Sequence, residues 1–579
     1  MTETSQRRRI IVVVAFLACL GLGLSARLCF LHLGDNERLL ARIQDIREVE
    51  QELVVSRGRV LDRNGNIMAL DMSMRNVAVD PKFMREHGHP RFTGLQLSRL
   101  LALDPAMVFA HISRDQQYVE LAKQVPEETV RQIEAMRLPG VRCPEFSKRH
   151  YPRGSLMSHV VGYANAEAVG SAGIEQKMER YLRGVPGLRV TEVDGRRREV
   201  YLRRAMEIEP QPGADIQLTL DQNLQYFVEK ALDDALATNG AKGAWAIVQH
   251  VRTGEILAMA SRPDYDLNNF NAVDADNRMN RAIGYTFEPG SVFKVIVYAA
   301  AFNEGILTPN EIFDCENGLW HYAGKPLRDY HPYGRLTTTE ALKKSSNIAA
   351  AKIAIRLGED RLYRYLKLFG IGTPTGISLP GEEGGILSPR NKWTKLSVTR
   401  IPMGHEVAVT SMQMLQAVSA IANGGEMMRP LVLKRVTNNK GEALSVPQPE
   451  AVSHPIRPET ARLMARLLTE VTEDGTGKRA RVAGHSVAGK TGTAEKPGPG
   501  GYDAKRNLAS FVGFLPAENP EVSIMVTFDE PHGDFRTGGA IAAPVFQAIA
   551  EQTVRYLDVP PVPETQRFTF AGGSDAVKE

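Results

Sequence analysis

The sequence predicts a multidomain α+β protein with one N-terminal transmembrane helix, a mixed pedestal domain and a larger C-terminal α+β domain. Its 579 residues exceed the length of most single domains. One long apolar run lies near the N-terminus, and short segments with many Gly and Pro breaks follow it. In the remaining chain, apolar strand-like runs lie at both ends and helical segments lie between them. This order predicts one antiparallel sheet flanked by helices and joined to a helical subdomain.

The apolar run at residues 10–33 is predicted to anchor the chain in a membrane. About 20 mostly apolar residues span a bilayer, and Arg27 lies near one end, where its long side chain can reach the interface. Residues 1–9 include three consecutive arginines, so we expect a cytoplasmic tail there and an extracytoplasmic remainder. A cleaved signal peptide is the alternative, but the run is long for one and its small residues lie inside it.

The other predicted domain boundaries lie where the hydropathy pattern or the composition of the sequence changes. Residues 35–52 are charged and compatible with a helix, and residues 34–221 as a whole are predicted to form the pedestal. The Asp-Arg-Asn-Gly sequence at residues 62–65 indicates a turn between two short strands. The C-terminal domain is predicted at residues 222–559. Residues 560–579 contain Pro, Gly and Ser and few apolar residues, which predicts a disordered tail.

The strands of the predicted C-terminal sheet come from two regions of the chain. Residues 243–260 contain two apolar runs around Arg-Thr-Gly, which indicates a hairpin. Near the other end we expect strands at residues 486–493, 509–515 and 522–528, and a final amphipathic helix at residues 541–556.

Composition narrows the function classes. Charge is near balance, with 71 Lys and Arg against 67 Asp and Glu, and nothing indicates a nucleic-acid-binding protein. The four cysteines form no CxxC or Cys/His cluster that would indicate a metal site. Their spacing leaves open whether Cys143 and Cys315 form a disulfide.

The first motif with catalytic chemistry is Ser-Val-Phe-Lys at residues 291–294, directly after the break at Pro289 and Gly290. Serine is favoured at a helix start, and residues three apart share a helix face, so the Lys294 amine can approach the Ser291 hydroxyl. A serine is a weak nucleophile until a base takes its proton, and a lysine of lowered pKa can be that base. Taken alone, the pattern is more typical of a helix cap beside an exposed lysine.

The second motif is Ser-Ser-Asn at residues 345–347, between two predicted helical segments. In a loop that faces a cleft, the Ser345 hydroxyl can relay a proton to a leaving amine, and the Asn347 amide can hold a substrate carbonyl. The alternative interpretation is a helix N-cap, because Ser and Asn are preferred caps.

The third motif is Lys-Thr-Gly-Thr at residues 490–493, on a predicted strand. Gly492 inside a strand indicates close approach by a ligand or another backbone. Lys490 and the hydroxyls of Thr491 and Thr493 suit a peptide with a carboxylate terminus bound beside an exposed edge. The alternative is a solvated strand end. Each of the three motifs occurs once, in the order SxxK, SxN, KTG, which is typical of penicillin-binding proteins and class A β-lactamases.

With these motifs in place, the chain resembles the class B penicillin-binding proteins over nearly its whole length. Residues 57–65, 149–163 and 173–175 resemble three conserved boxes of the class's non-catalytic domain. Residues 253–259 and 379–382 also match the class pattern. The boxes are not expected in soluble β-lactamases or simple D,D-carboxypeptidases. The resemblance implies a dimerisation-type pedestal, a penicillin-binding transpeptidase domain and no glycosyltransferase module.

Within class B, the chain most resembles the FtsI division transpeptidases, on residues 403–410 and its modest pedestal. The resemblance implies a peptidoglycan D,D-transpeptidase of septal wall synthesis, in the inner (cytoplasmic) membrane with its catalytic domain in the periplasm. The implied partners are stem peptides ending in D-Ala-D-Ala, β-lactams as inhibitors, a SEDS-type polymerase such as FtsW, and other division proteins. An elongation-type transpeptidase, a non-enzymatic penicillin sensor or division scaffold, and a hydrolase remain alternatives.

The resemblance also implies a role for each motif residue. Ser291 is the nucleophile, Lys294 its base, Ser345 the proton relay and Lys490 the electrostatic support, while Asn347 orients the donor amide. Substrate contacts are implied for the remaining members of the second and third motifs: Ser346, Thr491, Gly492 and Thr493. Backbone N–H groups of Ser291 and Thr493 are implied as the oxyanion hole. The mechanism implied by the resemblance requires no metal and no organic cofactor. For Glu288 and His405, which lie near the motifs, a structural role is favoured over a catalytic one.

Overall fold

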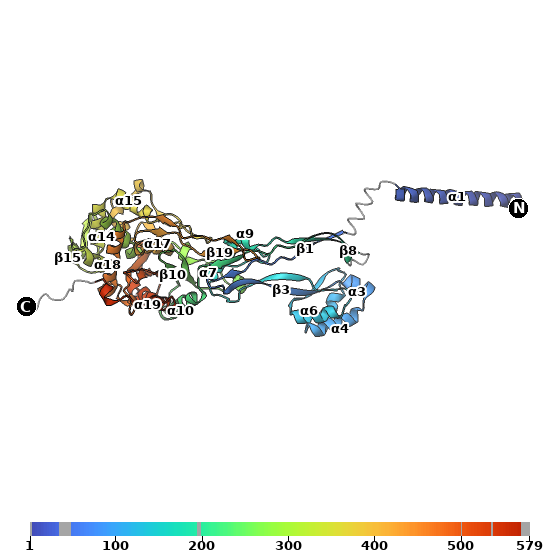
Figure 1. Ribbon diagram of the computed structural model, residues 1–579, viewed down its shortest axis with the longest axis horizontal. Coiled ribbons are helices and arrows are strands. Elements are labelled where there is room, and N and C mark those ends of the chain that lie inside the picture. The colour runs from blue at the N-terminus through green and yellow to red at the C-terminus, as the bar shows by residue number, and fades with distance from the viewer. Residues whose placement is uncertain (1–2, 34–47, 194–198, 499–500, 534–535, 569–579) are drawn as a thin grey trace, which may run out of the picture. The chain divides into compact units, whose positions relative to one another are not determined.

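The computed structural model describes residues 3–33, 48–193, 199–498, 501–533 and 536–568 (Figure 1). These residues fall into two compact units. One unit contains residues 1–55 and 185–211, and the other contains residues 56–184 and 212–579.

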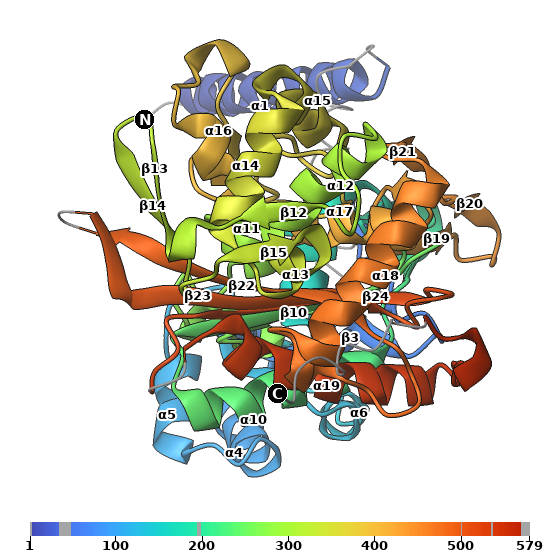
Figure 2. The same cartoon turned by 90° about the vertical axis from the view of Figure 1, so that its left-hand side faces the viewer.

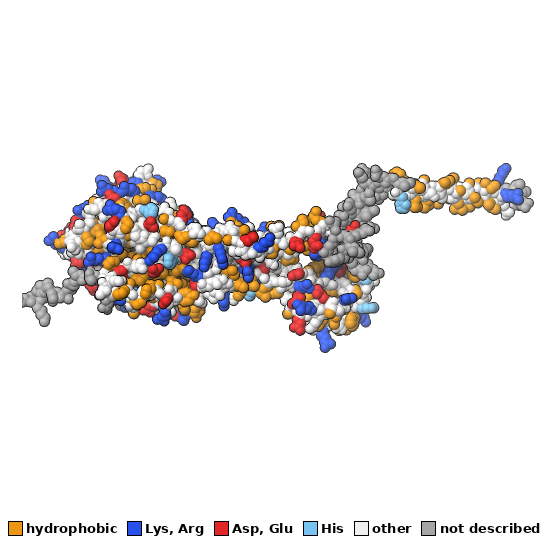
Figure 3. All heavy atoms as spheres, viewed as in Figure 1, with side chains coloured by type: hydrophobic (Ala, Val, Ile, Leu, Met, Phe, Trp, Pro, Cys, Tyr) orange, Lys and Arg blue, Asp and Glu red, His pale blue; other side chains and the backbone are white. Residues whose placement is uncertain are grey.

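The first unit contains a long apolar helix and a small sheet. The helix α1 (Glu3–Leu33) includes a 28-residue segment, Ser5–His32, that is long enough to cross a membrane, and an 18-residue window within it has a mean hydropathy of 2.3. Figure 3 shows hydrophobic side chains along α1 and basic ones at its N-terminal end. Three antiparallel strands form the sheet, in the order β1-β7-β8. Their bounds are Glu48–Leu53, Gly187–Val193 and Glu199–Ile208.

Residues 48–52, the described end of the segment expected to be compatible with a helix, lie in the strand β1 (Glu48–Leu53) instead. They form β1 because each of them pairs with a residue of β7, so tertiary pairing outweighs a weak local preference for helix. The preceding residues 34–47 lie outside the described part of the chain.

The second unit begins with a mixed region that extends to residue 221. Its elements are β2 (Val60–Leu61), β3 (Ile67–Val79), α3 (Pro81–His87), α4 (Pro90–Leu100), α5 (Pro105–Ile112), β4 (Val119–Val125), α6 (Glu127–Ala135), β5 (Val141–Arg142), β6 (Glu145–His150), α7 (Ser158–Val161), α8 (Gly173–Lys177), α9 (Glu179–Leu182) and β9 (Asp215–Leu218). The predicted turn at residues 62–65 is confirmed, since the Asp62 carboxylate accepts hydrogen bonds from the N–H groups of Asn64 and Asn66. Gly65 occupies the left-handed region there, with φ of 90°.

A buried ion-pair network joins the three box-like segments of this region. The Glu175 carboxylate is fully buried and accepts hydrogen bonds from Arg57 at 2.6 Å and from Arg149 at 2.7 Å. Arg149 also pairs with Asp71 at 3.0 Å, and Arg57 with Glu179 at 2.6 Å. Because unpaired buried charges are costly, this network fixes the three segments relative to one another.

The rest of the second unit is built on the predicted antiparallel sheet, whose strand order is β11-β10-β24-β23-β22. The strands are β10 (Gly243–His250), β11 (Ile256–Arg262), β22 (Ala488–Gly498), β23 (Gly501–Leu515) and β24 (Val522–Asp529). The α+β prediction and the hairpin at residues 243–260 are thus confirmed. In Figure 2, α10 (Gln222–Asn239) and α19 (Gly538–Tyr556) cover one face of the sheet. Their apolar side chains share one core with the strands.

Helices between the two halves of the sheet cover its other face and form the helical subdomain (Figure 2). They are α11 (Arg281–Gly284), α12 (Lys294–Asn303), α13 (Thr338–Lys343), α14 (Asn347–Leu357), α15 (Glu359–Leu368), α16 (Ser397–Arg400), α17 (Ser411–Ala422) and α18 (Pro458–Asp474). Short strands lie among them: β12 (Ile312–Asp314), β13 (Leu319–Tyr322), β14 (Lys325–Arg328), β15 (Arg335–Thr337), β16 (Ile386–Leu387), β17 (Val407–Ala408), β18 (Met427–Met428), β19 (Leu433–Thr437), β20 (Ala443–Ser445) and β21 (Ala451–Ser453). Of these, β19 pairs with β9 and so links the sheet and its helices to the preceding region.

The chain after α19 continues along the domain surface. Residues 560–568 belong to the predicted disordered tail, yet Arg567 donates a hydrogen bond to the Gly484 carbonyl at 3.0 Å and the Phe568 N–H donates one to Glu518 at 2.9 Å. Residues 569–579 lie outside the described part of the chain.

Candidate active site

Ser291 is half-buried in a single 3₁₀ turn, η2 (Gly290–Phe293), from which the α-helix α12 continues. Gly290 has a φ of 61°, and a Cβ at this position would lie 2.7 Å from the carbonyl oxygen of Thr493. Only glycine fits both the backbone angle and the space. The glycine before the serine therefore brings the first and third motifs into contact.

Lys294 connects the first motif to the second. Its side chain is fully buried, and its Nζ donates hydrogen bonds to the Ser345 carbonyl at 2.6 Å, to the Ser345 hydroxyl at 3.2 Å and to Asn347 Oδ1 at 2.7 Å. Burial lowers the pKa of Lys294 to about 7, although the negative charge of Asp329 acts in the opposite direction. An amine with this pKa can accept a proton near neutral pH.

The Ser-Ser-Asn loop lies between α13 and α14. Ser345 adopts the left-handed conformation, with φ of 59°, which turns the chain so that Ser345 and Asn347 both reach Lys294. Ser346 is fully buried and is the N-cap of α14, since its hydroxyl accepts a hydrogen bond from the Ala349 N–H at 3.1 Å. The Ser346 hydroxyl is thus used within the fold, and its contact with substrate stays a prediction.

Asp329 supports this loop from outside all three motifs. It follows β14 directly, and its carboxylate accepts hydrogen bonds from the Ser346 hydroxyl at 2.7 Å, the Ile348 N–H at 3.0 Å and the Asn347 N–H. The preceding carbonyl, that of Arg328, accepts a hydrogen bond from the Asn347 side chain at 2.9 Å. Asp329 therefore fixes both the backbone and the side chain of the second motif.

The third motif lies on β22, at the edge of the sheet. Lys490 is fully buried, and its Nζ donates to the Thr491 carbonyl at 3.3 Å. Burial and the positive charge of Lys294 hold the pKa of Lys490 well below its usual range. Gly492 packs against the turn that carries Ser291, where a Cβ would lie 2.9 Å from the Val292 side chain. As expected from the sequence, this glycine marks a close approach, here by a side chain of the first motif.

The hydroxyls of the two threonines in the third motif each contact a neighbouring segment. Thr491 is nearly buried, and its hydroxyl lies 2.9 Å from that of Thr476, in the loop after α18. Thr493 is exposed, and its hydroxyl accepts a hydrogen bond from the Gly538 N–H at 3.1 Å at the start of α19. These contacts place several hydroxyls beside the turn that carries Ser291.

The structure thus brings the three motifs together. Lys294 hydrogen-bonds Ser345 and Asn347, and its charge acts on Lys490. Within the described part of the chain, the Ser291 hydroxyl makes no hydrogen bond, although it lies one turn before Lys294. The described residues also contain no group of three or more His, Cys, Asp or Glu side chains that could hold a metal ion.

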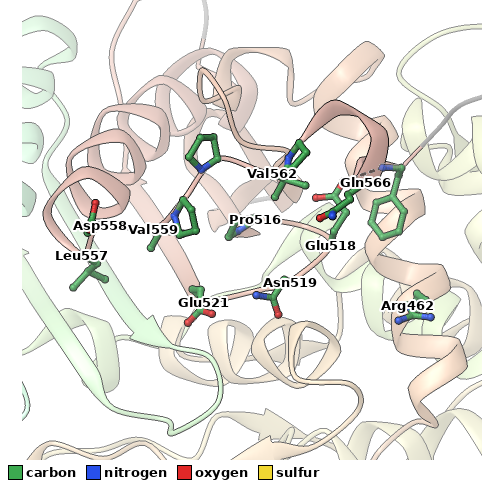
Figure 4. Close-up of a pocket in the computed structure, with 14 residues that line it drawn as sticks. Arg462, Pro516, Glu518, Asn519, Glu521, Leu557, Asp558, Val559, Val562 and Gln566 are labelled. Atoms are coloured by element: carbon green, nitrogen blue, oxygen red, sulfur yellow. Dashed lines mark hydrogen bonds between the residues drawn. The ribbon is translucent and has the colours of Figure 1, made fainter.

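A large surface hollow lies elsewhere. It has a volume of about 670 Å³ and is lined by α18, the loop before β24 and residues 557–568 (Figure 4). Its charged side chains include Arg462, Glu518 and Glu521, and none of the motif residues lines it. Size alone therefore does not mark the chemical site in this protein, whereas the convergence of the motifs does.

A comparison with protein-family models matches residues 244–551 to the penicillin binding protein transpeptidase domain and residues 52–218 to the penicillin-binding protein dimerisation domain. The chain belongs to the penicillin-binding protein transpeptidase family. The first match contains all three motifs, and the second contains the box-like segments joined by Glu175.

Named relatives and solved structures agree with this family. Stage V sporulation protein D of Bacillus subtilis is 32% identical, over 97% of this chain and 88% of its own length. The peptidoglycan D,D-transpeptidase FtsI of Escherichia coli is 29% identical, over 90% of this chain and 87% of its own. Penicillin binding protein 3 of Mycobacterium tuberculosis, complexed with ampicillin, has a TM-score of 0.70 at 26% identity and covers 89% of this chain and 98% of its own.

Two residues of this penicillin-binding protein's site were missed from the sequence. Asp329 lies 16 residues before the second motif, and Thr476 lies 14 residues before the third. Neither stands in a pattern of its own, because each acts through a contact that only the folded chain provides. The Gly residues on both sides of Thr476 indicate a tight loop, which was the one available signal.

Proposed function

We propose that this member of the penicillin-binding family is a serine-type peptidoglycan D,D-transpeptidase that forms its acyl-enzyme on Ser291. The observation that carries the proposal is the buried amine of Lys294, which follows Ser291 by one turn and hydrogen-bonds Ser345 and Asn347. A buried lysine whose pKa is about 7 is suited to accept the serine proton. The names of the relatives support the same reaction.

In the first half of the reaction, the Ser291 hydroxyl attacks the carbonyl of the penultimate D-Ala of a donor stem peptide. Lys294 takes the hydroxyl proton, and the backbone N–H groups of Ser291 and Thr493 stabilise the oxyanion. Ser345 passes a proton to the nitrogen of the departing D-Ala. Thr491 and Thr493 bind the terminal carboxylate, and the positive field of the site favours that anion.

In the second half, an amine of a neighbouring stem peptide attacks the ester carbonyl. A new amide bond forms, the bond to the Ser291 oxygen breaks, and that oxygen regains a proton. β-Lactams enter the same first half because their strained amide takes the place of the D-Ala-D-Ala bond. The relative complexed with ampicillin is consistent with this.

Labelling with a fluorescent penicillin tests the assignment. Full-length protein in detergent should be labelled on Ser291, and Ser291→Ala and Lys294→Ala should lose the label while keeping a cooperative thermal transition. Ser113→Ala is the matched control, because Ser113 is an exposed serine at the end of α5. Label on a peptide that lacks Ser291 contradicts the proposal.

For the cell, we propose a septal role with the N-terminus in the cytoplasm, α1 in the inner membrane and the catalytic domain in the periplasm. The apolar α1 and the FtsI relatives support this arrangement. We further propose a pedestal at residues 34–221, a transpeptidase domain at residues 222–559, and contact with an FtsW-like SEDS polymerase. A fluorescent fusion that concentrates along the sidewall of growing cells instead of at the septum favours the elongation-type alternative.

A further inference from the structure

A histidine and a glutamate form a hydrogen-bonded pair beside the nucleophile turn. His405 Nδ1 lies 3.0 Å from Glu288 Oε2, and the two side chains are 29% and 21% exposed. The other oxygen of Glu288 accepts hydrogen bonds from the Glu406 N–H and the Tyr502 hydroxyl, each at 3.1 Å. A carboxylate on Nδ1 fixes the imidazole with its proton on that nitrogen and leaves Nε2 as a proton acceptor.

The backbone places this pair next to Ser291. A Cβ on Gly404 would collide with the backbone of Gly290, so the two glycines are in direct contact. Gly290 adjoins Ser291, and Gly404 adjoins His405. Glu288 itself precedes the nucleophile by three residues. The pair is therefore held at a fixed position on the N-terminal side of the nucleophile.

The second nitrogen of the histidine is available. In the described part of the chain, Nε2 of His405 makes no hydrogen bond, and the ring packs against Tyr502 with centroids 5.0 Å apart. Tyr502 comes from the β22–β23 hairpin, which carries the third motif. On the other side, Met403 packs with Ile348 at the start of α14, which carries the second motif. The pair thus lies beside Ser291, between the β22–β23 hairpin and the start of α14.

The second half of the proposed reaction needs a proton acceptor of this kind. A primary amine such as that of lysine has a pKa of about 10.4 and enters as an ammonium ion, which has no free electron pair. Forming the amide removes two protons from it: one returns to the Ser291 oxygen through Lys294, and one must go to another base. After the first half of the reaction Lys294 is neutral again, because the serine proton has left with the departing D-Ala. It must stay neutral to receive the second proton and pass it to the Ser291 oxygen, so it cannot also hold the first.

We propose, resting on the transpeptidase function above, that Nε2 of His405 accepts the first proton of the acceptor ammonium ion, with Glu288 as the residue that orients it. The neutral amine then attacks the acyl-enzyme carbonyl, the C–N bond forms and the C–O bond to Ser291 breaks. The negative charge of Glu288 attracts the cationic acceptor and stabilises the imidazolium ion that results. His405 then releases its proton to water.

The test measures how the acyl-enzyme divides between amine and water. Full-length protein reacts with a thioester analogue of the stem peptide in the presence of a D-amino acid acceptor, and the ratio of aminolysis to hydrolysis is measured. His405→Asn keeps a hydrogen-bond donor toward Glu288 but removes the base, so the ratio should fall about 10²-fold. Glu288→Gln should lower the same ratio by a smaller factor. The matched control is His454→Asn, because His454 is exposed and lies 3.7 Å from Glu426, away from the site.

The outcomes separate the two proposals. A ratio that is unchanged in His405→Asn, or a fall of acylation, aminolysis and hydrolysis by one common factor, overturns the role of His405 and indicates that the pair only braces the loop. Failure of the unsubstituted protein to form any acyl-enzyme on Ser291 overturns the transpeptidase function instead.

Discussion

Replacing Asp329 with alanine should weaken both the fold and the acylation step, because this carboxylate supports the second motif. Three donors lose their acceptor: the Ser346 hydroxyl and the N–H groups of Asn347 and Ile348. A hydrogen bond to a charged group contributes about 1.5–3 kcal/mol, but water can reach the partly buried helix start and replace part of it. Since losing a helix cap alone costs about 1 kcal/mol, we expect Asp329→Ala to lower the free energy of unfolding by about 3 kcal/mol.

The effect on acylation follows from geometry. Asn347 and Ser345 contact Lys294 only while their loop keeps its position, and a displacement of about 1 Å in a catalytic group can cost about 10² in rate. The second-order rate of acylation by a fluorescent penicillin, followed by stopped flow, should therefore fall about 10²-fold in Asp329→Ala. Conditions are chosen where the variant is fully folded by circular dichroism.

The control is Asp234→Ala, which removes an exposed carboxylate paired with Lys230 on α10. Such surface pairs contribute about 0.5 kcal/mol, so neither stability nor acylation should change appreciably. An acylation rate in folded Asp329→Ala equal to that of the unsubstituted protein refutes the argument that this carboxylate positions the loop.

Three further outcomes are expected. The acylation rate should rise with pH and level off above about 7. Burial lowers the pKa of Lys294 to about 7, and only its neutral amine accepts a proton. A rate that falls over this pH range contradicts Lys294 as the base. Glu175→Ala removes the buried carboxylate that Arg57 and Arg149 share and leaves each arginine with one remaining carboxylate, so urea denaturation should show a loss of about 3 kcal/mol in the free energy of unfolding. A loss below about 1 kcal/mol would show that the remaining partners and water compensate. Thr476→Val removes the hydroxyl that contacts Thr491, so the Kd of a peptide ending in D-Ala-D-Ala should rise about tenfold. An unchanged Kd would show that this hydroxyl takes no part in binding the carboxylate.

Local chemistry made part of the site predictable from the sequence. Ser291 and Lys294 are three residues apart, so a helical turn places their side chains on the same face, independent of the tertiary structure. Gly492 also carried a local signal, since a glycine inside a strand indicates a close approach, and the structure shows Val292 beside it. The sheet was predictable for the same reason, because the apolar runs of β10, β11 and β24 lie almost entirely in the core.

Other features depended on contacts between distant segments. β22 extends to Gly498, well beyond the strand expected at residues 486–493, because its polar and Pro-containing end pairs with β23 and needs no apolar pattern. Asp329 directly follows the β13–β14 hairpin, and no periodicity in the sequence shows that this hairpin lies beside α14. Ser346 fits two local patterns at once, the motif and the N-cap, and the structure shows the buried hydroxyl as the N-cap of α14.

The position of the third motif explains why the three motifs act together. β22 is the last strand of the five-stranded sheet, so one side of its backbone pairs with no other strand among the described residues. An unpaired edge is a hazard for a folded protein unless something covers it. Here the nucleophile turn packs against the same strand at Gly290 and Gly492. An extended peptide that adds to this edge as a further strand would carry its carbonyl past Ser291, while its terminal carboxylate meets the hydroxyls of Thr491 and Thr493. Under the proposed function, the edge that the sheet leaves open is the surface that would select a peptide with a free carboxylate end.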